Sequence, residues 1–544
     1  MTGRCKGRDR TIMDTNVATK GRNETSHLYD KLEDRILARD QVGASLAYYS
    51  LVKAGRPLNE IIAEGVRIHA PYTHVPYHER FDDGYPNFVN NDHCLLSARA
   101  TINLTKMLPK DLAMLPMAQT IWYIPTGLDI WNQKLGKAPG HYTRGFAGKI
   151  SDPPAPVVYW PDYEPIQQTG PLHERLGNWF TLVHRGEVEN AYRHFLGLMQ
   201  DQPNRREVLA ELVFSGLIDV QDRIYMNRSF TTGHKGYRAR ATVELGNALG
   251  WDNAHQVIYA GALDIAVGPR WYSTYEMACN TVKEQIEGES LHAVPYGGVS
   301  EAELAALRQT GDLSLADENE LIAALLNELE PANTAAITKL LKAGKDPRRI
   351  IDAIQIAAAQ LTIDTHNPNN FSMPMHCYEY SNALGWFYDN FDHPRRLRLL
   401  YVAAAFVTMT AWHQRNIGEM VSQPIQIPAG ADKLSAGDLL ARIDVTTCAQ
   451  NAPESLAWMK AYLCNVADRA PLVALMALDA CKLGNDPHNQ EIPQNMLEDF
   501  LKSRSPNRDR LLMACAKHSS GHRKYGDPLE AARRFGEGVG VTVQ

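Results

Sequence analysis

The sequence lacks any uninterrupted apolar run of the roughly eighteen residues that a membrane-spanning helix needs, which excludes an ordinary membrane span. The first residues, Met1 to Lys20, are basic and polar and contain no apolar core of about seven residues, so the sequence predicts no secretory signal. Together the two absences predict a cytoplasmic protein with no membrane partner.

Cysteine is sparse for a chain of 544 residues. The eight cysteines stand at positions 5, 94, 279, 377, 448, 464, 481 and 515. None belongs to a Cys-x-x-Cys pair, which excludes thioredoxin-type redox chemistry and a zinc ribbon. Scattered cysteines of this kind indicate reduced thiols, as in the cytoplasm.

Several common catalytic signatures are absent as well. The chain has no His-Glu-x-x-His, no Gly-x-Gly-x-x-Gly after a strand, no Gly-x-x-x-x-Gly-Lys-Ser/Thr and no Gly-x-Ser-x-Gly. Common zincins, Rossmann-type dinucleotide binding, P-loop nucleotide hydrolysis and the usual serine hydrolases are therefore excluded. The net charge of -6 argues against a nucleic-acid partner.

One stretch of the sequence occurs in three copies, centred on His93, His234 and His376, which are spaced 141 and 142 residues apart. The first two histidines are followed at the same distance by Ala-Arg-Ala-Thr. The second and third copies share an upstream pattern that ends in Asp222 and Asp364, each twelve residues before its His. Self-similarity at a long fixed period predicts a divergent internal repeat.

The repeat also predicts the domain organisation. A fourth, shorter copy carries Asp479, with His488 nine residues further on. Because no series of alternating strands is present and stacked units share one core, we expect an all-α fold of three to four helical units in one solenoid-like or toroidal body. This single domain should cover residues 31–544, with units at about 45–130, 190–275, 335–425 and 455–544 and an aromatic, proline-rich insertion at about 137–171. Residues 1–30 are expected to be a disordered basic segment.

Each unit is expected to hold a helix, a polar loop, the His and a longer helix. Apolar residues from Arg35 to Val52 follow a helical period, and Gly55 with Pro57 indicates a stop and a restart before a second helix at Glu60–His69. Further along the chain, Asp252–Val267 and Arg395–Thr410 are apolar enough for buried helices, whereas Gly288–Ser314 and Gln423–Gly437 are expected to be polar connections.

The repeated histidines carry the strongest chemical signal. If each lies in the first turn of a helix and the preceding loops converge, then His93, His234, His376 and His488 meet at one centre. Neutral imidazole binds borderline metals, and carboxylates complete a charge-balanced shell, so the pattern favours a metal site. Asp222, Asp364 and Asp479 are expected beside the histidines as further ligands or as partners that orient the imidazoles, the first two as catalytic groups.

A structural role competes with this hypothesis. Each His would then cap its helix or hydrogen-bond a neighbouring unit, as recurring histidines in repeat proteins commonly do. Arg99 and Arg240 stand six residues after their histidines, about 600° around a helix, so we expect them to bind backbone or a neighbouring unit and not the ligand of the histidines.

Gly233-His234 with the later Leu249-Gly250-Trp251, and Met375-His376 leading into Asn382-Ala383-Leu384, resemble the long helical region of some bacterial proteins that also carry a Rieske iron-sulfur domain. More loosely, the chain is similar to the questin oxidase family, helical proteins associated with the oxygenation of polyketides. The resemblance covers about Ile36 to Arg534 and implies redox or oxygenase chemistry. The chain has no Cys-x-His with a later Cys-x-x-His, so it holds no Rieske cluster, and its electrons would come from a separate electron-transfer partner.

These observations lead to one leading hypothesis and two alternatives. The leading hypothesis is a non-haem metal-dependent oxidoreductase or monooxygenase, with iron as the cofactor, that acts on a small organic substrate. The candidates for an aromatic pocket wall are Trp122, Tyr123, Tyr159, Trp160, Trp251, Trp271 and Trp386. The alternatives are a helical scaffold that binds a protein partner, and a hydrolase or lyase that uses the metal as a Lewis acid.

Overall fold

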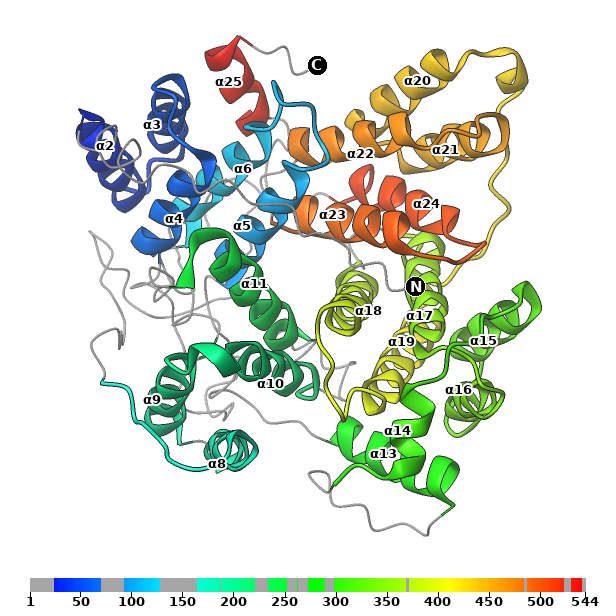
Figure 1. The fold of residues 1–544 in the computed structure, drawn as a ribbon. Helices are drawn as coiled ribbons and strands as arrows, with labels where there is room; N and C mark the ends of the chain where they lie inside the picture. Colours follow the sequence, from blue (N-terminus) through cyan, green and yellow to red (C-terminus); the bar gives the residue numbers. More distant parts are fainter. Residues whose placement is uncertain are drawn as a thin grey trace, which may run out of the picture.

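In the computed structural model the chain is a body of packed helices (Figure 1). The structure describes residues 24–69, 92–127, 164–185, 187–220, 233–251, 262, 273–288, 298–367, 371–483, 487–522 and 530–540. Within these ranges the only extended pairings are two isolated bridges, Gly311 with Lys345 and Thr365 with Met420. The all-α fold expected from the sequence is confirmed.

The described chain begins with α2 (Ser26–Leu37), α3 (Gln41–Lys53) and α4 (Leu58–His69). Residues 26–30 are therefore helical, although the sequence placed them in a disordered segment. Tyr29 explains the difference, because it is buried and its hydroxyl donates to Glu60 Oε1 of α4 at 2.7 Å. The single helix expected from Arg35 to Val52 is also broken, since the Asp40 carboxylate accepts from the backbone N–H of Gly43 and starts α3.

Four central helices lie around the middle of the molecule (Figure 1): α5 (Asp92–Leu104), α11 (His234–Leu249), α18 (Ser372–Asn390) and α23 (Pro487–Lys502). Their contacts form a closed ring, because α5 and α18 each pack against both α11 and α23. Helices α5 and α23 run in the same direction. On α5 and α23, Ser97 contacts Gln490 and, further along both helices, Arg99 contacts Gln494.

The same succession of helices surrounds each central helix. The helix before it packs against it in every case: α4 before α5, α10 (Arg205–Leu217) before α11, α17 (Pro347–Asp364) before α18, and α22 (Ala470–Lys482) before α23. Three central helices also pack against the helix that follows them in the described chain: α5 against α6 (Leu115–Tyr123), α18 against α19 (Arg398–Asn416) and α23 against α24 (Asp509–Ser519). This order is the one that a repeat of helical units predicts, and the repeat itself stays a prediction.

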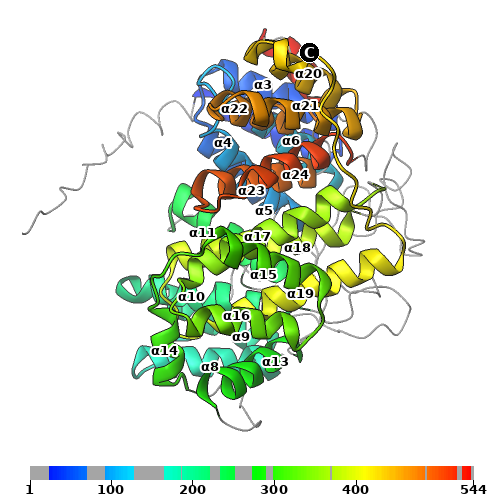
Figure 2. The ribbon, with the colours of Figure 1, turned by 90° about the vertical axis from the view of Figure 1, so that its right-hand side faces the viewer.

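The remaining helices lie around this assembly. They are α8 (Leu172–Arg185), α9 (Val188–Met199), α13 (Ser273–Thr281), α14 (Glu301–Leu307), α15 (Leu315–Asn327), α16 (Ala332–Lys342), α20 (Ala436–Cys448), α21 (Ala452–Asn465) and α25 (Glu530–Val539). Figure 2 shows the first and last parts of the chain above, helices α8 to α19 below, and the central helices where the two halves meet. The central helices therefore join parts of the chain that are far apart in the sequence.

The structure differs in part from the connections and the insertion expected from the sequence. Gly288–Ser314 contains α14, whose first turn is capped because the Ser300 side chain accepts from the backbone N–H of Glu303. Between Gln423 and Gly437, α20 begins only at Ala436, after a short 3₁₀ turn at Ala431–Lys433. Most of the expected insertion at 137–171, and nearly all of Asp252–Val267, lies outside the described residues, whereas Arg395–Thr410 is largely the buried helix α19.

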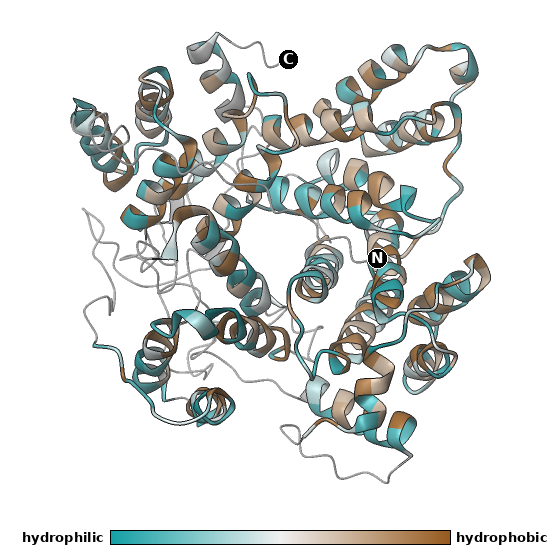
Figure 3. Cartoon of the chain, viewed as in Figure 1, coloured by the Kyte–Doolittle hydropathy of each residue, from teal (hydrophilic) through white to brown (hydrophobic). Residues whose placement is uncertain are grey.

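The central helices bury polar side chains, which is unusual for positions in the middle of a protein. On α23, His488, Asn489, Gln490 and Glu491 are all buried in succession, and Figure 3 shows hydrophilic colour along this helix inside the molecule. Polar groups in such a position need partners across the helix interfaces. The interior of the central bundle is therefore the first place to look for a functional site.

The structure also bears on the expectations about membrane spans and cysteines. Among the described residues, no helix has both the length and the apolar character needed to cross a membrane. The seven described cysteines are free thiols, and five of them are buried.

Candidate functional site

Three of the four histidines expected as ligands lie together at the N-terminal ends of the central helices. The centre of the His376 ring lies 4.7 Å from that of His234 and 5.6 Å from that of His488. All three imidazoles are buried, and they come from α11, α18 and α23. His93 is the second residue of α5, and its side chain lies outside the described residues.

The start of α11 is built so that it can approach α18 closely. Gly233 precedes His234 with a φ of 99°, a left-handed conformation that glycine adopts without strain. A Cβ at this position would lie 2.7 Å from Cζ of Tyr237. The Tyr237 hydroxyl passes over the helix end and donates to the backbone carbonyl of His376, which ties the two histidine-bearing turns together.

The His376 ring has a defined tautomer. Its Nδ1 lies 2.6 Å from the carbonyl oxygen of Ser372, and a carbonyl can only accept, so Nδ1 carries the hydrogen. In the neutral ring the lone pair is then on Nε2. Metal-binding histidines are commonly held in this way, with the other ring nitrogen donating to a backbone carbonyl. The local geometry of His376 therefore fits a ligand that binds through Nε2.

Two further histidines extend the group. His522 lies 6.1 Å from His488 between ring centres, and the His518 and His522 rings stack 5.0 Å apart at the end of α24. Both residues are buried. Neither residue was among the histidines expected from the sequence, although their spacing of four residues was a usable signal, because residues four apart on a helix share one face. The backbone N–H of His522 donates to the carbonyl of His518 just after the end of α24.

The histidines do not form a closed metal site as they stand. Among the residues whose side chains are described, one group of three potential ligands has all its ligand atoms within 4.8 Å of one another, and it is Asp444, Cys448 and Asp479. That group already has a cation, since Lys482 Nζ is 2.7 Å from Asp444 and 3.4 Å from Asp479. Burial, together with the neighbouring Asp444, raises the pKa of the Asp479 carboxyl well above its usual range, although Lys482 opposes the shift.

Of the three aspartates expected beside the histidines, the two that the structure describes contact other residues. Asp222 lies outside the described residues. Asp364 ends α17, where its Oδ1 accepts from Gln360 Nε2 at 2.9 Å and burial raises its pKa. Asp479 lies on α22 beside Lys482. Neither Asp364 nor Asp479 is hydrogen-bonded to a histidine of the group, so neither orients an imidazole.

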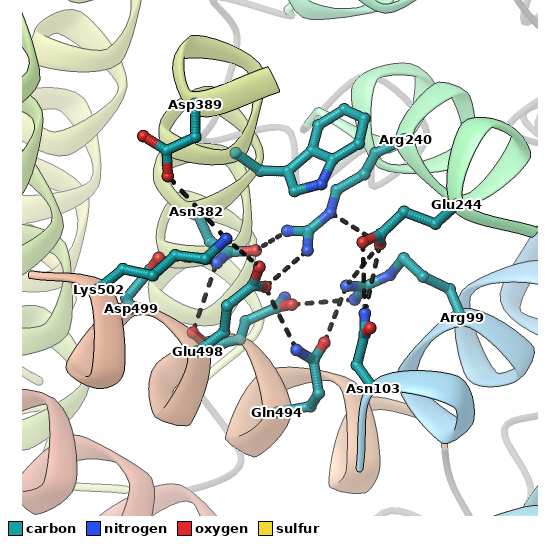
Figure 4. A network of polar contacts seen from close by, with 12 residues as sticks. Arg99, Asn103, Arg240, Glu244, Asn382, Asp389, Gln494, Glu498, Asp499 and Lys502 are labelled. Carbon is teal, nitrogen blue, oxygen red and sulfur yellow. Dashed lines mark hydrogen bonds and ion pairs between the residues drawn. The ribbon is translucent and has the colours of Figure 1, made fainter. Parts of the chain in front are cut away.

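Deeper in the bundle the central helices share a network of polar side chains (Figure 4). Its core is formed by residues six positions after each histidine: Arg99 donates to Gln494 at 2.8 Å, and Arg240 donates to Asn382. Both arginines bind neighbouring central helices, which is one of the two roles expected for them. The network closes the bundle below the histidines and fixes the relative depth of the four helices.

The positive side chains of this network contact carboxylates. Arg240 contacts Glu244 at 3.1 Å and Glu498 at 2.6 Å. Burial acts to raise the pKa of Glu498, but Arg240 and Lys502 outweigh it and hold the pKa well below its usual range. The next residue, Asp499, is fully buried beside that carboxylate, and burial followed by the repulsion of Glu498 raises its pKa to about 7.

A cavity of 670 Å³ opens at the opposite end of α18. Its wall includes Phe180 of α8, Glu211 of α10, and His393 and Arg395 between α18 and α19. The Glu211 carboxylate accepts from Arg395 at 2.6 Å and from His393 at 3.0 Å, so the charged groups are already paired. Of the aromatic residues expected to line a substrate pocket, the four that the structure describes do not line this cavity: Trp122, Tyr123, Trp251 and Trp386. Tyr159, Trp160 and Trp271 lie outside the described residues. From His376 to the end of α18 is about 21 Å at 1.5 Å per residue, so a molecule bound there would not touch the histidines.

No protein-family model, curated protein sequence or solved structure matches the chain. The assignment of a function therefore rests on the geometry of the histidines, and the resemblance to the Rieske-associated and questin oxidase families stays a prediction.

Proposed function

We propose that the protein is a metal-dependent oxidoreductase that holds a non-haem iron ion among His93, His234, His376 and His488 and oxidises a small organic molecule. The observation that carries the proposal is the meeting of three buried imidazoles from three helices that are far apart in the sequence. A scaffold that only packs helices has no need to gather its histidines at one point.

The spacing of the rings supports this proposal. With a metal–nitrogen distance of 2.0–2.1 Å, each ring centre stands about 3.2 Å from the ion, so two ligand rings at 90–109° are roughly 4.5–5.2 Å apart. The measured separations are 4.7 and 5.6 Å. Binding would therefore need the rings to turn and His488 to move slightly inward, with little change in the backbone.

The helix ends favour the neutral, ligand form of the histidines. The N-terminal end of a helix carries a partial positive charge, which disfavours a protonated imidazole beside it. Burial acts in the same direction by disfavouring any charged ring. An iron ion held by imidazoles with open positions supplies oxygen or electron-transfer chemistry when bound, while the chain binds the ion, orients the rings and excludes bulk water. The electrons for such chemistry would come from a separate electron-transfer partner.

The test is the metal content of the purified protein and of His234→Ala and His376→Ala. We expect iron in the wild type and the loss of most of it in both variants, with the helical circular-dichroism signal intact. The matched control is His194→Ala on α9. Like His376, His194 has its Nδ1 beside the carbonyl oxygen of the residue four positions earlier, Asn190 O at 2.7 Å, but this contact is exposed to solvent. That control should keep its metal.

Three other results would change the assignment. Zinc in place of iron would favour a hydrolase or lyase that uses the metal as a Lewis acid. Absence of metal from the wild type, even after incubation with ferrous iron, would favour the scaffold. Unchanged metal content with a lower melting temperature in both histidine variants would show that the histidines hold helices together, at about 1 to 3 kcal/mol for each abandoned buried partner.

A further inference from the structure

We propose that Glu379 and Glu491 supply the carboxylate ligands of the metal site, in the role that the sequence analysis gave to the aspartates. This inference rests on the proposed function, because it concerns the same ion.

Each glutamate follows a histidine of the group by three residues. His376-x-x-Glu379 lies on α18 and His488-x-x-Glu491 lies on α23, which pack against each other. Residues three apart lie on one face of a helix. Side chains also lean toward the N-terminus of their helix, so a glutamate one turn deeper reaches back toward the level of its histidine. The two pairs can thus turn two imidazoles and two carboxylates toward one point.

Both glutamates lie inside the bundle, where Glu379 is 2% exposed and Glu491 is 0% exposed. The helices that carry them, α18 and α23, pack against each other, and each also packs against another central helix, α11 and α5 respectively, so both carboxylates lie inside the ring of central helices.

Glu491 has one oxygen in use and one available. Its Oε1 accepts from Arg99 Nη2 at 3.2 Å. Its Oε2 is buried and, within the described part of the chain, has no hydrogen-bond partner. A buried carboxylate oxygen without a partner is unfavourable unless a cation or a donor reaches it. An ion held by the histidines would provide that partner.

The helix ends also require anionic ligands. The histidines lie in the first two turns of α11, α18 and α23, so the partial positive charges of these helix ends add at the proposed metal position. A divalent cation is disfavoured there unless carboxylates bind it. Glu379 and Glu491 are the first acidic residues that α18 and α23 carry after their histidines, whereas the first on α11 is Glu244, in the deeper network.

The experiment compares Glu379→Gln and Glu491→Gln with Glu498→Gln, on the full chain. Glutamine keeps the size of the side chain, and at position 491 it can still accept from Arg99. Glu498 is the matched control, because it is a partly buried acid on the same helix as Glu491, two turns deeper, with 12% of its side chain exposed, and is paired with Arg240. Each protein is stripped of metal and titrated with ferrous iron under anaerobic conditions against a chelator, and is melted with and without iron.

We expect Glu379→Gln and Glu491→Gln each to weaken iron binding at least about 10-fold, because the loss of even an outer partner of a metal ligand has an effect of this size. The rise in melting temperature on adding iron should shrink in the same two variants, since that rise follows the affinity. Glu498→Gln should lower the melting temperature of the metal-free protein and keep the wild-type iron affinity.

Wild-type iron affinity in both Glu379→Gln and Glu491→Gln, together with iron loss in His376→Ala, would overturn the carboxylate assignment and leave the proposed function standing. A wild-type protein that binds no iron would overturn both. An equal loss of affinity in all three glutamine variants would also overturn it, because the effect would then come from disturbing buried charge and not from a ligand.

Discussion

Helices α10 and α11 cross with their backbones in contact, and this crossing places His234. A Cβ added at Gly216 of α10 would lie 2.7 Å from the carbonyl oxygen of Lys235, 2.8 Å from its carbonyl carbon and 2.9 Å from the backbone nitrogen of Gly236. All three are backbone atoms, which cannot rotate away as the end of a side chain can. The substitution Gly216→Ala must therefore push the two helices apart.

The magnitude follows from two opposing effects. Overpacking of this kind destabilises a protein by about 1–3 kcal/mol. The higher helix propensity of alanine offsets up to about 1 kcal/mol of that loss. Steric strain should win, because no flexible side chain is available to yield, and we expect a net loss of about 1–2 kcal/mol. Gly177→Ala is the control, since Gly177 lies within α8 with nothing within 4 Å of the added Cβ, and it should gain about 0.5–1 kcal/mol.

The assay is urea unfolding followed by circular dichroism for both variants, with iron affinity measured in parallel. Gly216→Ala should unfold at a lower urea concentration than the wild type, and Gly177→Ala at a higher one. Iron affinity should fall only in Gly216→Ala, because Lys235 directly follows His234 and moves with it. A Gly216→Ala protein as stable as Gly177→Ala would refute the reasoning, since it would show that the two helices are not in backbone contact.

Two further predictions concern buried charges. Arg398 contacts both oxygens of the fully buried Glu303 at 3.0 Å, so Arg398→Ala should destabilise the protein by about 3–5 kcal/mol, and Arg398→Met with Glu303→Leu should recover much of that loss in urea unfolding. For Asp499 the folded pKa of about 7 lies above the unfolded value of about 3.9, so its contribution to stability is complete at low pH and is lost as the pH rises toward 7, by at most about 4 kcal/mol. Urea midpoints at pH 5 and pH 8 should therefore differ less in Asp499→Asn than in the wild type, and an equal difference in both proteins would contradict the assignment.

The helical fold and the meeting of the histidines could be predicted from the sequence for one physical reason. A helix is a rigid unit with a fixed period, so a residue at the same offset in each copy has the same position on its helix. His234 is the first residue of α11 and His376 is the fifth residue of α18, so the two positions differ by about one turn, and the rings nevertheless meet. The signals at the ends of short helices, such as the cap at Asp40, depend on single residues and were missed.

The aspartates show where the same reasoning fails. Asp364 stands twelve residues before His376, and the chain between them leaves α17 and enters α18 through a loop. Spacing across a loop does not determine where a side chain lies, because the path of the loop is free. Asp364 accordingly contacts Gln360 on its own helix. The pattern His-x-x-Glu, which occurs at His376 and again at His488, was the more reliable signal because it is contained within a helix.

The arginines show a different limit. Arg240 is about 120° around α11 from His234 in an ideal helix, which suggests that the two side chains face different neighbours. In a bundle of four helices, however, each helix has two central neighbours, so a broad face of it is interior. His234 and Arg240 lie on the two sides of that face, and both meet α18, at His376 and Asn382 respectively.

The helix ends give the distribution of charge around the histidines a common cause. The partial positive charges of α11, α18 and α23 lie at the ends where the histidines stand, and the partial negative charges lie at the far ends, beyond the deeper network. Carboxylates are stabilised toward the positive ends, where Glu379 and Glu491 follow the histidines, whereas Arg99 and Arg240 lie in the middle of their helices and are paired with Glu491, Glu244 and Glu498. Neutral imidazoles at the positive ends neither gain nor lose by this field, so the two glutamates are the groups that would make a cation stable among them. The order of side chains along α18 and α23, histidine first and then glutamate, is therefore the order that a cation at the helix N-termini requires.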